Sequence, residues 1–194
     1  MKQHVGLLLL LIALPVAGRA QTRDYRIDPD HSRVLFRIDH LGLSSSLGTF
    51  AKLDGEFRFD EGYWKSAHVE VSIPLDSLNL SDADWRRKVL EDYLKAGEHP
   101  DARFESTMLV PDDGRMKTGR LSGQLTLNGV TRPVELQLRF NGSNKGIYTK
   151  LRRKTGFSAT TTIRRSDFGL DKQLDLVGDE VRIDIEVEGI EQKR

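Results

Sequence analysis

The densest set of potentially reactive side chains in the sequence is formed by Asp28, Asp30, His31 and His40. Carboxylates and imidazoles bind divalent metals and also perform acid–base catalysis. Their spacing matches no diagnostic metal motif, and the sequence contains no cysteine to support a structural zinc site. An Asp-Pro turn and histidines at strand ends also tie down loops through hydrogen bonds. We expect a structural role or contact with a ligand head group in preference to a metal site.

The serines of the sequence do not indicate nucleophilic catalysis. No Gly-x-Ser-x-Gly motif is present, and Ser32 does not form a dyad with His31, because neighbours on a strand face opposite sides. The tripeptide Asp167-Phe168-Gly169 matches a kinase motif, but the glycine-rich loop and catalytic loop that give it meaning are missing. We therefore expect no catalytic residue and interpret the chain as a binding protein, with an enzyme as the alternative.

Eight stretches of the chain alternate apolar and polar residues with a period of two. Successive side chains on a strand point to opposite faces, so each stretch predicts a strand with one dry face and one wet face. Such strands build antiparallel sheets and disfavour parallel α/β folds. Asn128-Gly129 predicts a tight hairpin turn between two of them. We predict an all-β fold of about eight strands that close into an antiparallel barrel or pack as a sandwich.

Small residues interrupt the dry face of several predicted strands, as at Gly55, Ala67, Gly123 and Ala159. Because protein interiors contain few voids, either large side chains from facing strands or a ligand must fill this space. A lumen walled by aliphatic and aromatic residues suits an acyl or isoprenoid chain, since each buried methylene contributes about 0.8 kcal/mol. The predicted lumen wall on the strands consists of Phe36, Ile38, Phe57, Phe59, Val69, Val71, Phe104, Ser106, Met108, Gly123, Leu125, Leu136, Leu138, Phe157, Ala159, Thr161, Ile163, Ile183 and Ile185.

One segment, about 82–96, has apolar residues at helical spacing with charged residues between them. Ser81 is its expected N-cap, and Gly97 and Pro100 end it. We predict one amphipathic helix, inserted among the strands, that covers the mouth or the flank of the barrel. Its apolar face adds three residues to the predicted lumen wall: Trp85, Val89 and Tyr93.

Residues 1–20 have the features of a cleaved signal peptide. Lys2 precedes an apolar run from Val5 to Leu14, which is shorter than the span of about 20 residues that crosses a membrane, and small residues precede a cleavage site near Ala20. We expect residues 21–194 to form a single domain in the bacterial periplasm, with secretion as the alternative. The absence of cysteine excludes disulfides and a lipoprotein anchor.

The charges of the chain are nearly balanced, with 30 basic and 29 acidic residues. Nucleic-acid binding requires a clustered basic excess, so we expect no nucleic-acid partner. One basic cluster is formed by Lys150, Arg152, Arg153 and Lys154. It is either a solvated hairpin or a contact for an anionic partner, such as a lipid head group or a membrane surface touched transiently. The sequence leaves the oligomeric state open, a dimer included.

Several short motifs occur in a specific order and together span nearly all of residues 24–190. They are Asp28-Pro29-Asp30-His31-Ser32, Phe59-Asp60, His99-Pro100-Asp101-Ala102-Arg103-Phe104, Asn128-Gly129-Val130 and Gly178-Asp179-Glu180-Val181. In these motifs the chain resembles the YceI-like lipid- or polyisoprenoid-binding family. The resemblance implies an extended lipocalin-like barrel that holds an isoprenoid-type lipid, such as a quinone or a polyprenyl phosphate, for storage or transport, and that requires no other cofactor. An enzyme acting on such a lipid and a ligand-free interaction module are the alternatives. The residues assigned to head-group contact are His31, His40, Arg164 and Asp167.

Overall fold

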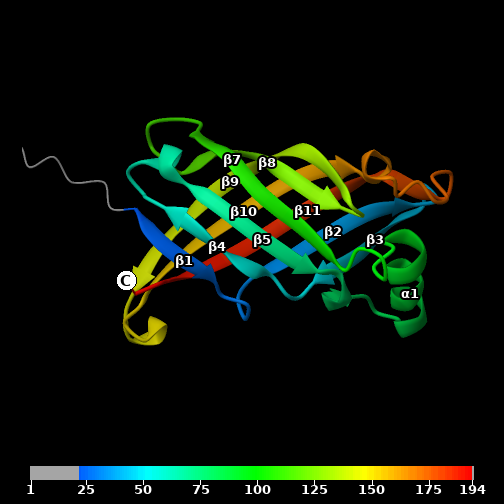
Figure 1. The fold of residues 1–194 in the computed structure, drawn as a ribbon, viewed down its shortest axis with the longest axis horizontal. Coiled ribbons are helices and arrows are strands. Elements are labelled where there is room, and N and C mark those ends of the chain that lie inside the picture. Colours follow the sequence, from blue (N-terminus) through cyan, green and yellow to red (C-terminus); the bar gives the residue numbers. More distant parts are fainter. Residues whose placement is uncertain (1–21, 194) are drawn as a thin grey trace, which may run out of the picture.

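The computed structural model describes residues 22–193, and the expected signal peptide lies outside this range. Antiparallel strands dominate the described chain (Figure 1). They are β1 (Arg23–Ile27), β2 (Arg33–His40), β3 (Ser44–Phe50), β4 (Asp54–Phe59), β5 (His68–Pro74), β6 (Leu78–Asn79), β7 (Asp101–Pro111), β8 (Thr118–Leu127), β9 (Val130–Lys145), β10 (Arg153–Arg164) and β11 (Val177–Glu191). Short helical segments connect them: η1 (Trp64–Ser66), η2 (Leu75–Ser77), α1 (Ala83–Lys88), η3 (Val89–Tyr93), η4 (Ile147–Thr149) and η5 (Arg165–Phe168).

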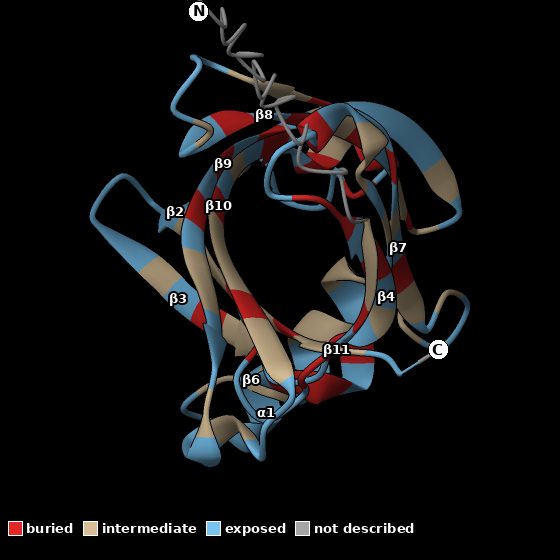
Figure 2. Cartoon of the chain, turned by 90° about the vertical axis from the view of Figure 1, so that its left-hand side faces the viewer, coloured by how far each residue is buried: buried red, intermediate tan, exposed pale blue. Residues whose placement is uncertain are grey.

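The strands form one sheet that closes on itself as a barrel. Neighbouring strands follow the order β1-β4-β5-β7-β8-β9-β10-β11, and β11 pairs again with β1. Figure 2 shows this ring of strands from the end opposite to α1. The prediction of an antiparallel barrel of about eight strands is confirmed, and the two-sheet sandwich is wrong. β2, β3 and β6 are additional strands next to β11.

Two walls of the barrel are each built from two strands in tandem, which makes the barrel long. β11 pairs with β2 from Val177 to Glu186 and then with β1 from Gly189 to Glu191. The partners follow the same arrangement, because β3 pairs with β2 and β4 pairs with β1. The segments between the tandem strands, 28–32 and 51–53, therefore interrupt the ladder near the middle of the wall.

An aromatic cluster fills the end of the barrel opposite to α1. Phe59 contacts Trp64, Phe140 and Phe157 with ring centroids 4.9–5.8 Å apart, mostly at steep angles, and Tyr25 stacks on Phe57 at 4.9 Å. Edge-to-face and offset-stacked pairs of this kind add to the stabilisation from burial alone. Large side chains thus close this end of the barrel without a ligand.

The predicted helix is present but shorter and differently capped. α1 ends at Lys88 and continues as one π-helical turn, η3, to Tyr93. Its N-cap is Asp82, whose Oδ1 accepts a hydrogen bond from the Trp85 N–H at 2.7 Å, so the expectation of Ser81 is wrong. A carboxylate at this position also interacts favourably with the helix dipole. No helix of the described chain is long and apolar enough to cross a membrane.

Candidate functional site

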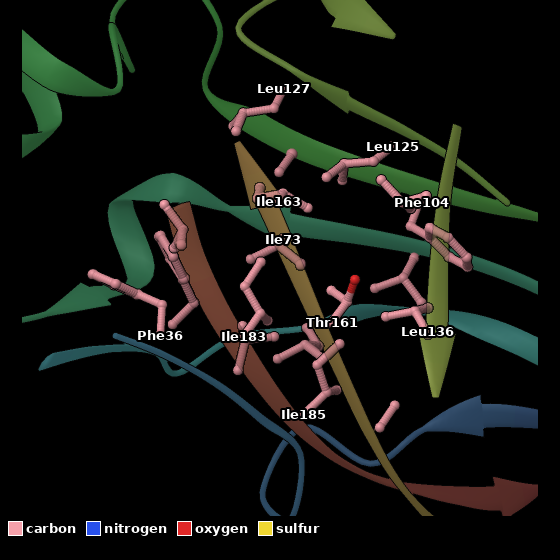
Figure 3. Close-up of a pocket in the computed structure, with 18 of the residues that line it drawn as sticks. Phe36, Ile73, Phe104, Leu125, Leu127, Leu136, Thr161, Ile163, Ile183 and Ile185 are labelled. Atoms are coloured by element: carbon pink, nitrogen blue, oxygen red, sulfur yellow. The ribbon is translucent and has the colours of Figure 1, made fainter. Parts of the chain in front are cut away.

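An elongated cavity of about 710 Å³ lies inside the barrel. This volume is within the range of small-molecule binding sites, about 300–1,000 Å³. β11 contributes wall residues from Val177 to Val187, and with about 3.3 Å per residue and a strand tilt of about 40° the cavity is about 25 Å long. Aliphatic and aromatic side chains point into it from strands all around the barrel, as Figure 3 shows for Phe104, Leu136 and Ile183.

Most residues of the predicted lumen wall line this cavity. They are Phe36, Ile38, Phe57, Phe59, Val69, Val71, Trp85, Val89, Tyr93, Phe104, Leu125, Leu136, Leu138, Phe157, Ala159, Thr161, Ile163, Ile183 and Ile185. Three predicted residues, Ser106, Met108 and Gly123, are not part of the wall. Sequence reasoning also missed some wall residues, among them Phe50, Leu109 and Arg165.

A β-bulge explains the position of Met108. The register between β7 and β8 shifts between Ser106 and Met108, so the alternation of inward and outward side chains reverses at this point. Leu109 is consequently buried at 3% exposure and lines the cavity, whereas Met108 is 55% exposed. A strict period of two along this strand therefore gave the wrong face for Met108.

The small residues at 106 and 123 serve packing and hydrogen bonding. A Cβ atom on Gly123 would lie 2.4 Å from the Cζ atom of Phe104, so glycine leaves room for that ring. Ser106 is buried, and its Oγ accepts a hydrogen bond from the Val69 N–H at 2.8 Å. Of the small residues noted in the sequence, Ala67, Ala159 and Thr161 face the cavity. Only part of the small-residue pattern thus reflects hollow space.

The cavity opens at the end of the barrel that carries α1. Three exposed wall residues, His40, Trp85 and Lys88, lie at this end, whereas the exposed Arg58 is on β4 next to the aromatic cluster that fills the other end. Val89 and Tyr93 of η3 also line the cavity, so α1 and η3 lie across its mouth. This agrees with the prediction that the inserted helix covers an opening of the barrel.

Charged groups on the cavity wall are all basic. Arg58, Lys88 and Arg165 line it, and no aspartate or glutamate does so within the described residues. Arg165 is buried, and its guanidinium donates to three backbone carbonyls, those of Gly178, Leu170 and Val177, at 2.6–2.9 Å. Burial lowers the pKa of the Arg165 guanidinium.

Residues 25–189 match the YceI-like domain family. The chain belongs to this family. A relative described as a UPF0312 protein of Azotobacter vinelandii is 37% identical over 199 residues, covering 99% of this chain and 100% of the relative.

Solved structures share the fold of this YceI-like chain. BcnA of Burkholderia cenocepacia aligns with a TM-score of 0.73 at 23% identity and covers 84% of this chain and 98% of its own. A polyisoprenoid binding domain from Saccharophagus degradans aligns with a TM-score of 0.63 at 15% identity and covers 87% and 98% of the two chains. At these identities the similarity shows a shared fold and nothing beyond it.

The four residues assigned to head-group contact do not come together in the YceI-like barrel. His40 is at the mouth of the cavity. Arg164 is exposed, and its Nε donates to Asp179 Oδ2 at 2.9 Å. Asp167 is exposed too, and neither residue belongs to the wall. Arg165, the residue after Arg164, lines the cavity because the chain turns into η5 at the end of β10.

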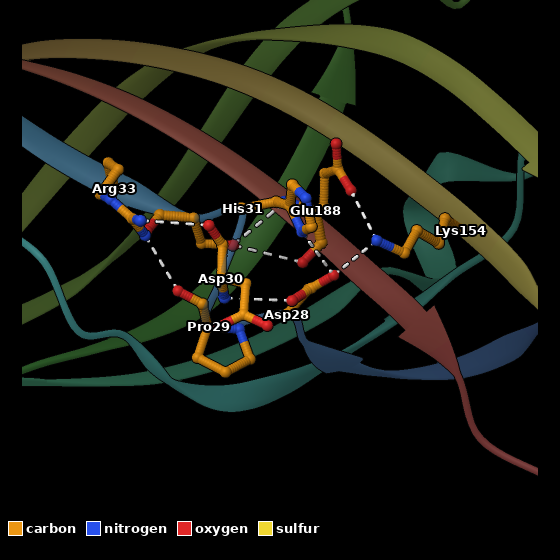
Figure 4. A network of polar contacts seen from close by, with 8 residues as sticks. Asp28, Pro29, Asp30, His31, Arg33, Lys154 and Glu188 are labelled. Carbon is orange, nitrogen blue, oxygen red and sulfur yellow. Dashed lines mark hydrogen bonds and ion pairs between the residues drawn. The ribbon is translucent and has the colours of Figure 1, made fainter. Parts of the chain in front are cut away.

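The fourth residue, His31, belongs to a polar network at the interruption between β1 and β2 (Figure 4). Asp28 Oδ2 accepts hydrogen bonds from Lys154 Nζ at 2.6 Å and contacts His31 Nδ1 at 3.0 Å. Lys154 Nζ also binds Glu188 Oε2 at 3.1 Å, and the Asp28 N–H donates to the Glu188 carbonyl at 2.8 Å. These bonds, together with those of Ser32 to the Glu188 backbone, fasten the interrupted wall to β11. The structure therefore favours the structural interpretation of this cluster.

The same network shifts the ionisation of its central carboxyl. Burial alone would raise the pKa of Asp28, but hydrogen bonds from Lys154, His31 and the Asp30 N–H outweigh it and hold this pKa below its ordinary value. The carboxylate thus stays charged because its partners surround it.

Two groups of side chains have the composition of metal ligands. Ligand atoms of Asp28, His31 and Glu188 lie within 4.8 Å of one another, but the Lys154 ammonium bridges the two carboxylates and supplies the cation in this space. The other group, His68, Glu70 and Glu105, lies on β5 and β7, with Glu70 opposite Glu105 in the ladder. Neither group touches the cavity wall.

Proposed function

We propose that this YceI-like protein binds a long-chain lipid of the isoprenoid type, a quinone or a polyprenyl phosphate, in the barrel cavity and stores or transports it. The observation that carries this proposal is a long apolar cavity that is closed at one end by aromatic side chains and open at the other. Three bonds of an extended chain span about 3.5 Å, so a cavity about 25 Å long accepts roughly 20 chain bonds, or roughly five isoprene units.

The wall chemistry supports a lipid over other ligands. Sugars and nucleotides would leave polar groups unpaired against a wall of Phe, Leu, Ile and Val, which costs free energy at every group. The fold is shared with a protein described as a polyisoprenoid binding domain. A solid core, which an interaction module without ligand would have, does not fit a cavity of about 710 Å³. His31 and Asp167, two reactive side chains assigned to head-group contact that an enzyme acting on the lipid could use, lie off the wall.

Export to the periplasm is part of the same proposal and rests on the sequence of residues 1–20. A transient contact with a membrane surface is supported by the loop between β9 and β10. Ile147, Tyr148 and Leu151 are 84%, 103% and 66% exposed there, beside the exposed side chains of Lys145 and Lys150. Apolar and basic side chains together favour anionic lipid surfaces. This loop lies at the end of the barrel opposite to α1 (Figure 1), so such contact would leave the cavity mouth accessible.

Native mass spectrometry of gently purified protein tests the lipid. We expect an added mass that organic extraction releases, and the extract identifies the molecule. Protein that is empty as purified and that also fails to bind an added isoprenoid alcohol would contradict the proposal. Incubation of the loaded protein tests the alternative, because an enzyme would convert the bound lipid and a carrier would return it unchanged.

A further inference from the structure

The wall of the cavity carries positive charge that no carboxylate on the wall balances. Of its basic residues, Arg58 donates to Asp24 at 3.1 Å on the barrel surface. The two others, Lys88 and Arg165, are near the mouth. Tyr93 lines the same region, and His40 lies at the rim. Apart from Arg58, the charged wall groups thus lie where the cavity opens, while the interior is almost entirely apolar.

The guanidinium of Arg165, near the mouth, has N–H groups that form no hydrogen bond with the described residues. Its Nε, Nη1 and Nη2 atoms each donate one hydrogen bond to a backbone carbonyl, those of Gly178, Leu170 and Val177. A guanidinium has five N–H groups, so one N–H on Nη1 and one on Nη2 remain. These two N–H groups can donate to the oxygens of a phosphate or a carboxylate. The three carbonyls hold the guanidinium in one orientation. Because they carry no formal charge, no group in direct contact neutralises its positive charge.

The acidic residues around the mouth are engaged elsewhere. Asp92 binds Lys172 at 3.1 Å, and Asp179 binds Arg164 and the hydroxyl and N–H groups of Ser166. Asp171 is exposed, and with Asp179 it acts on Arg165 only through space. Lys88 forms no ion pair with a described residue.

We propose that the mouth of the cavity binds an anionic lipid head group, a phosphate or a carboxylate, through Arg165 and Lys88, while the apolar tail extends toward the aromatic cluster. This inference rests on the proposed function and narrows it, because it selects an anionic amphiphile over a neutral quinone or alcohol. Arg165 supplies two directed hydrogen bonds, and Lys88, the last residue of α1, supplies a second charge at the mouth.

The test compares ligands that share a tail and differ in the head: geranylgeranyl phosphate, geranylgeraniol and, for a carboxylate, geranylgeranoic acid. We expect the phosphate to bind at least about tenfold more tightly than the alcohol, since hydrogen bonds to charged groups are the stronger ones. Lys88→Gln should reduce this preference severalfold without changing the affinity for the alcohol, and Lys88→Arg should retain it. Lys65→Gln, at the closed end, is the matched control. Comparison of the phosphate with geranylgeranoic acid then shows which anion the mouth prefers.

Arg165→Lys keeps the charge but loses the paired N–H groups, so the preference for the phosphate should fall while circular dichroism stays unchanged. If Arg165→Lys unfolds, the Lys88 variants alone decide. Equal affinity for phosphate and alcohol in the wild type would overturn the head-group site and leave lipid binding intact. A preference for phosphate that survives Lys88→Gln would overturn the assignment as well. If none of the three ligands binds, the proposed function itself fails.

Discussion

A phenylalanine in place of Ala159 tests whether the cavity holds the lipid tail. Ala159 is on β10, is 8% exposed, and lies between Leu138 and Ile185, which are also wall residues. The new ring would enter the cavity near the middle of the wall. If it displaces about three chain carbons at about 0.8 kcal/mol each, binding weakens by about 2.4 kcal/mol, which is about 60-fold in Kd.

The effect of Ala159→Phe on folding should be small, because the ring enters existing space. In a packed core a larger side chain typically costs about 1–3 kcal/mol. We expect the free energy of unfolding, measured by urea denaturation, to change by less than about 1 kcal/mol. Thr160→Phe is the control, since Thr160 is the next residue on the same strand and is exposed.

The binding assay is titration with a fluorescent prenyl probe, followed for both variants and the wild type. Ala159→Phe should strongly weaken the binding of the probe, and Thr160→Phe should leave its Kd unchanged. Two results would refute the reasoning: a loss of more than about 1 kcal/mol of stability in Ala159→Phe but not in Thr160→Phe, which indicates a packed core, or an unchanged Kd in a folded Ala159→Phe protein.

Three further predictions concern stability. Asp28→Asn should lower the free energy of unfolding at pH 7 by about 1–3 kcal/mol. Because the pKa of Asp28 is held below its ordinary value of 3.8, its contribution to stability is present above that value and is lost as the pH falls through the folded-state pKa. The stability of the variant should therefore fall less steeply at acid pH than that of the wild type, and equal slopes would contradict the role of Lys154. Met108→Lys should change stability by less than about 0.5 kcal/mol, whereas Leu109→Lys should cost several kcal/mol by burying a charge; the reverse order in urea denaturation would contradict the bulge. Phe59→Ala should cost about 3–5 kcal/mol, and a smaller loss would indicate that the aromatic cluster packs loosely.

Local patterns in the sequence were sufficient to predict most of the strands and most of the cavity wall, but not β3 (Ser44–Phe50), whose serine-rich sequence favours a connector. Alternation assigns a face to each residue of a regular strand, and Asn128-Gly129 predicts its turn because both residues take positive φ, 51° and 71°. The bulge before Met108 was not predictable in this way, since it depends on how β7 pairs with β8. The tandem pairing of β11 with β2 and β1 is likewise a long-range property.

Arg165 was missed for a related reason. It is a charged residue that follows the last alternating position of β10, and this pattern predicts a solvent-exposed side chain at the end of a strand. Its burial depends on three carbonyls, of which those of Val177 and Gly178 come from the far side of a loop, and no local pattern specifies that closure. Buried charges require such partners, so the site could be found only after the loop was placed.

The two ends of the barrel differ in how easily a lipid can enter, and this difference fixes the direction of binding. Passage through the wall would break ladder hydrogen bonds, and passage through the closed end would disrupt the packed rings around Phe59. The segment across the mouth has no fully buried residue. Its polar contacts with the rest of the barrel include those of Arg86 with Leu78 and Asp76, of Tyr93 with Gln173 and of Asp92 with Lys172, and Leu90 packs on the core only while partly buried. Its displacement therefore costs the least burial. In the proposed function, a lipid that enters there would move tail first toward the aromatic cluster, which would leave its head group beside Arg165.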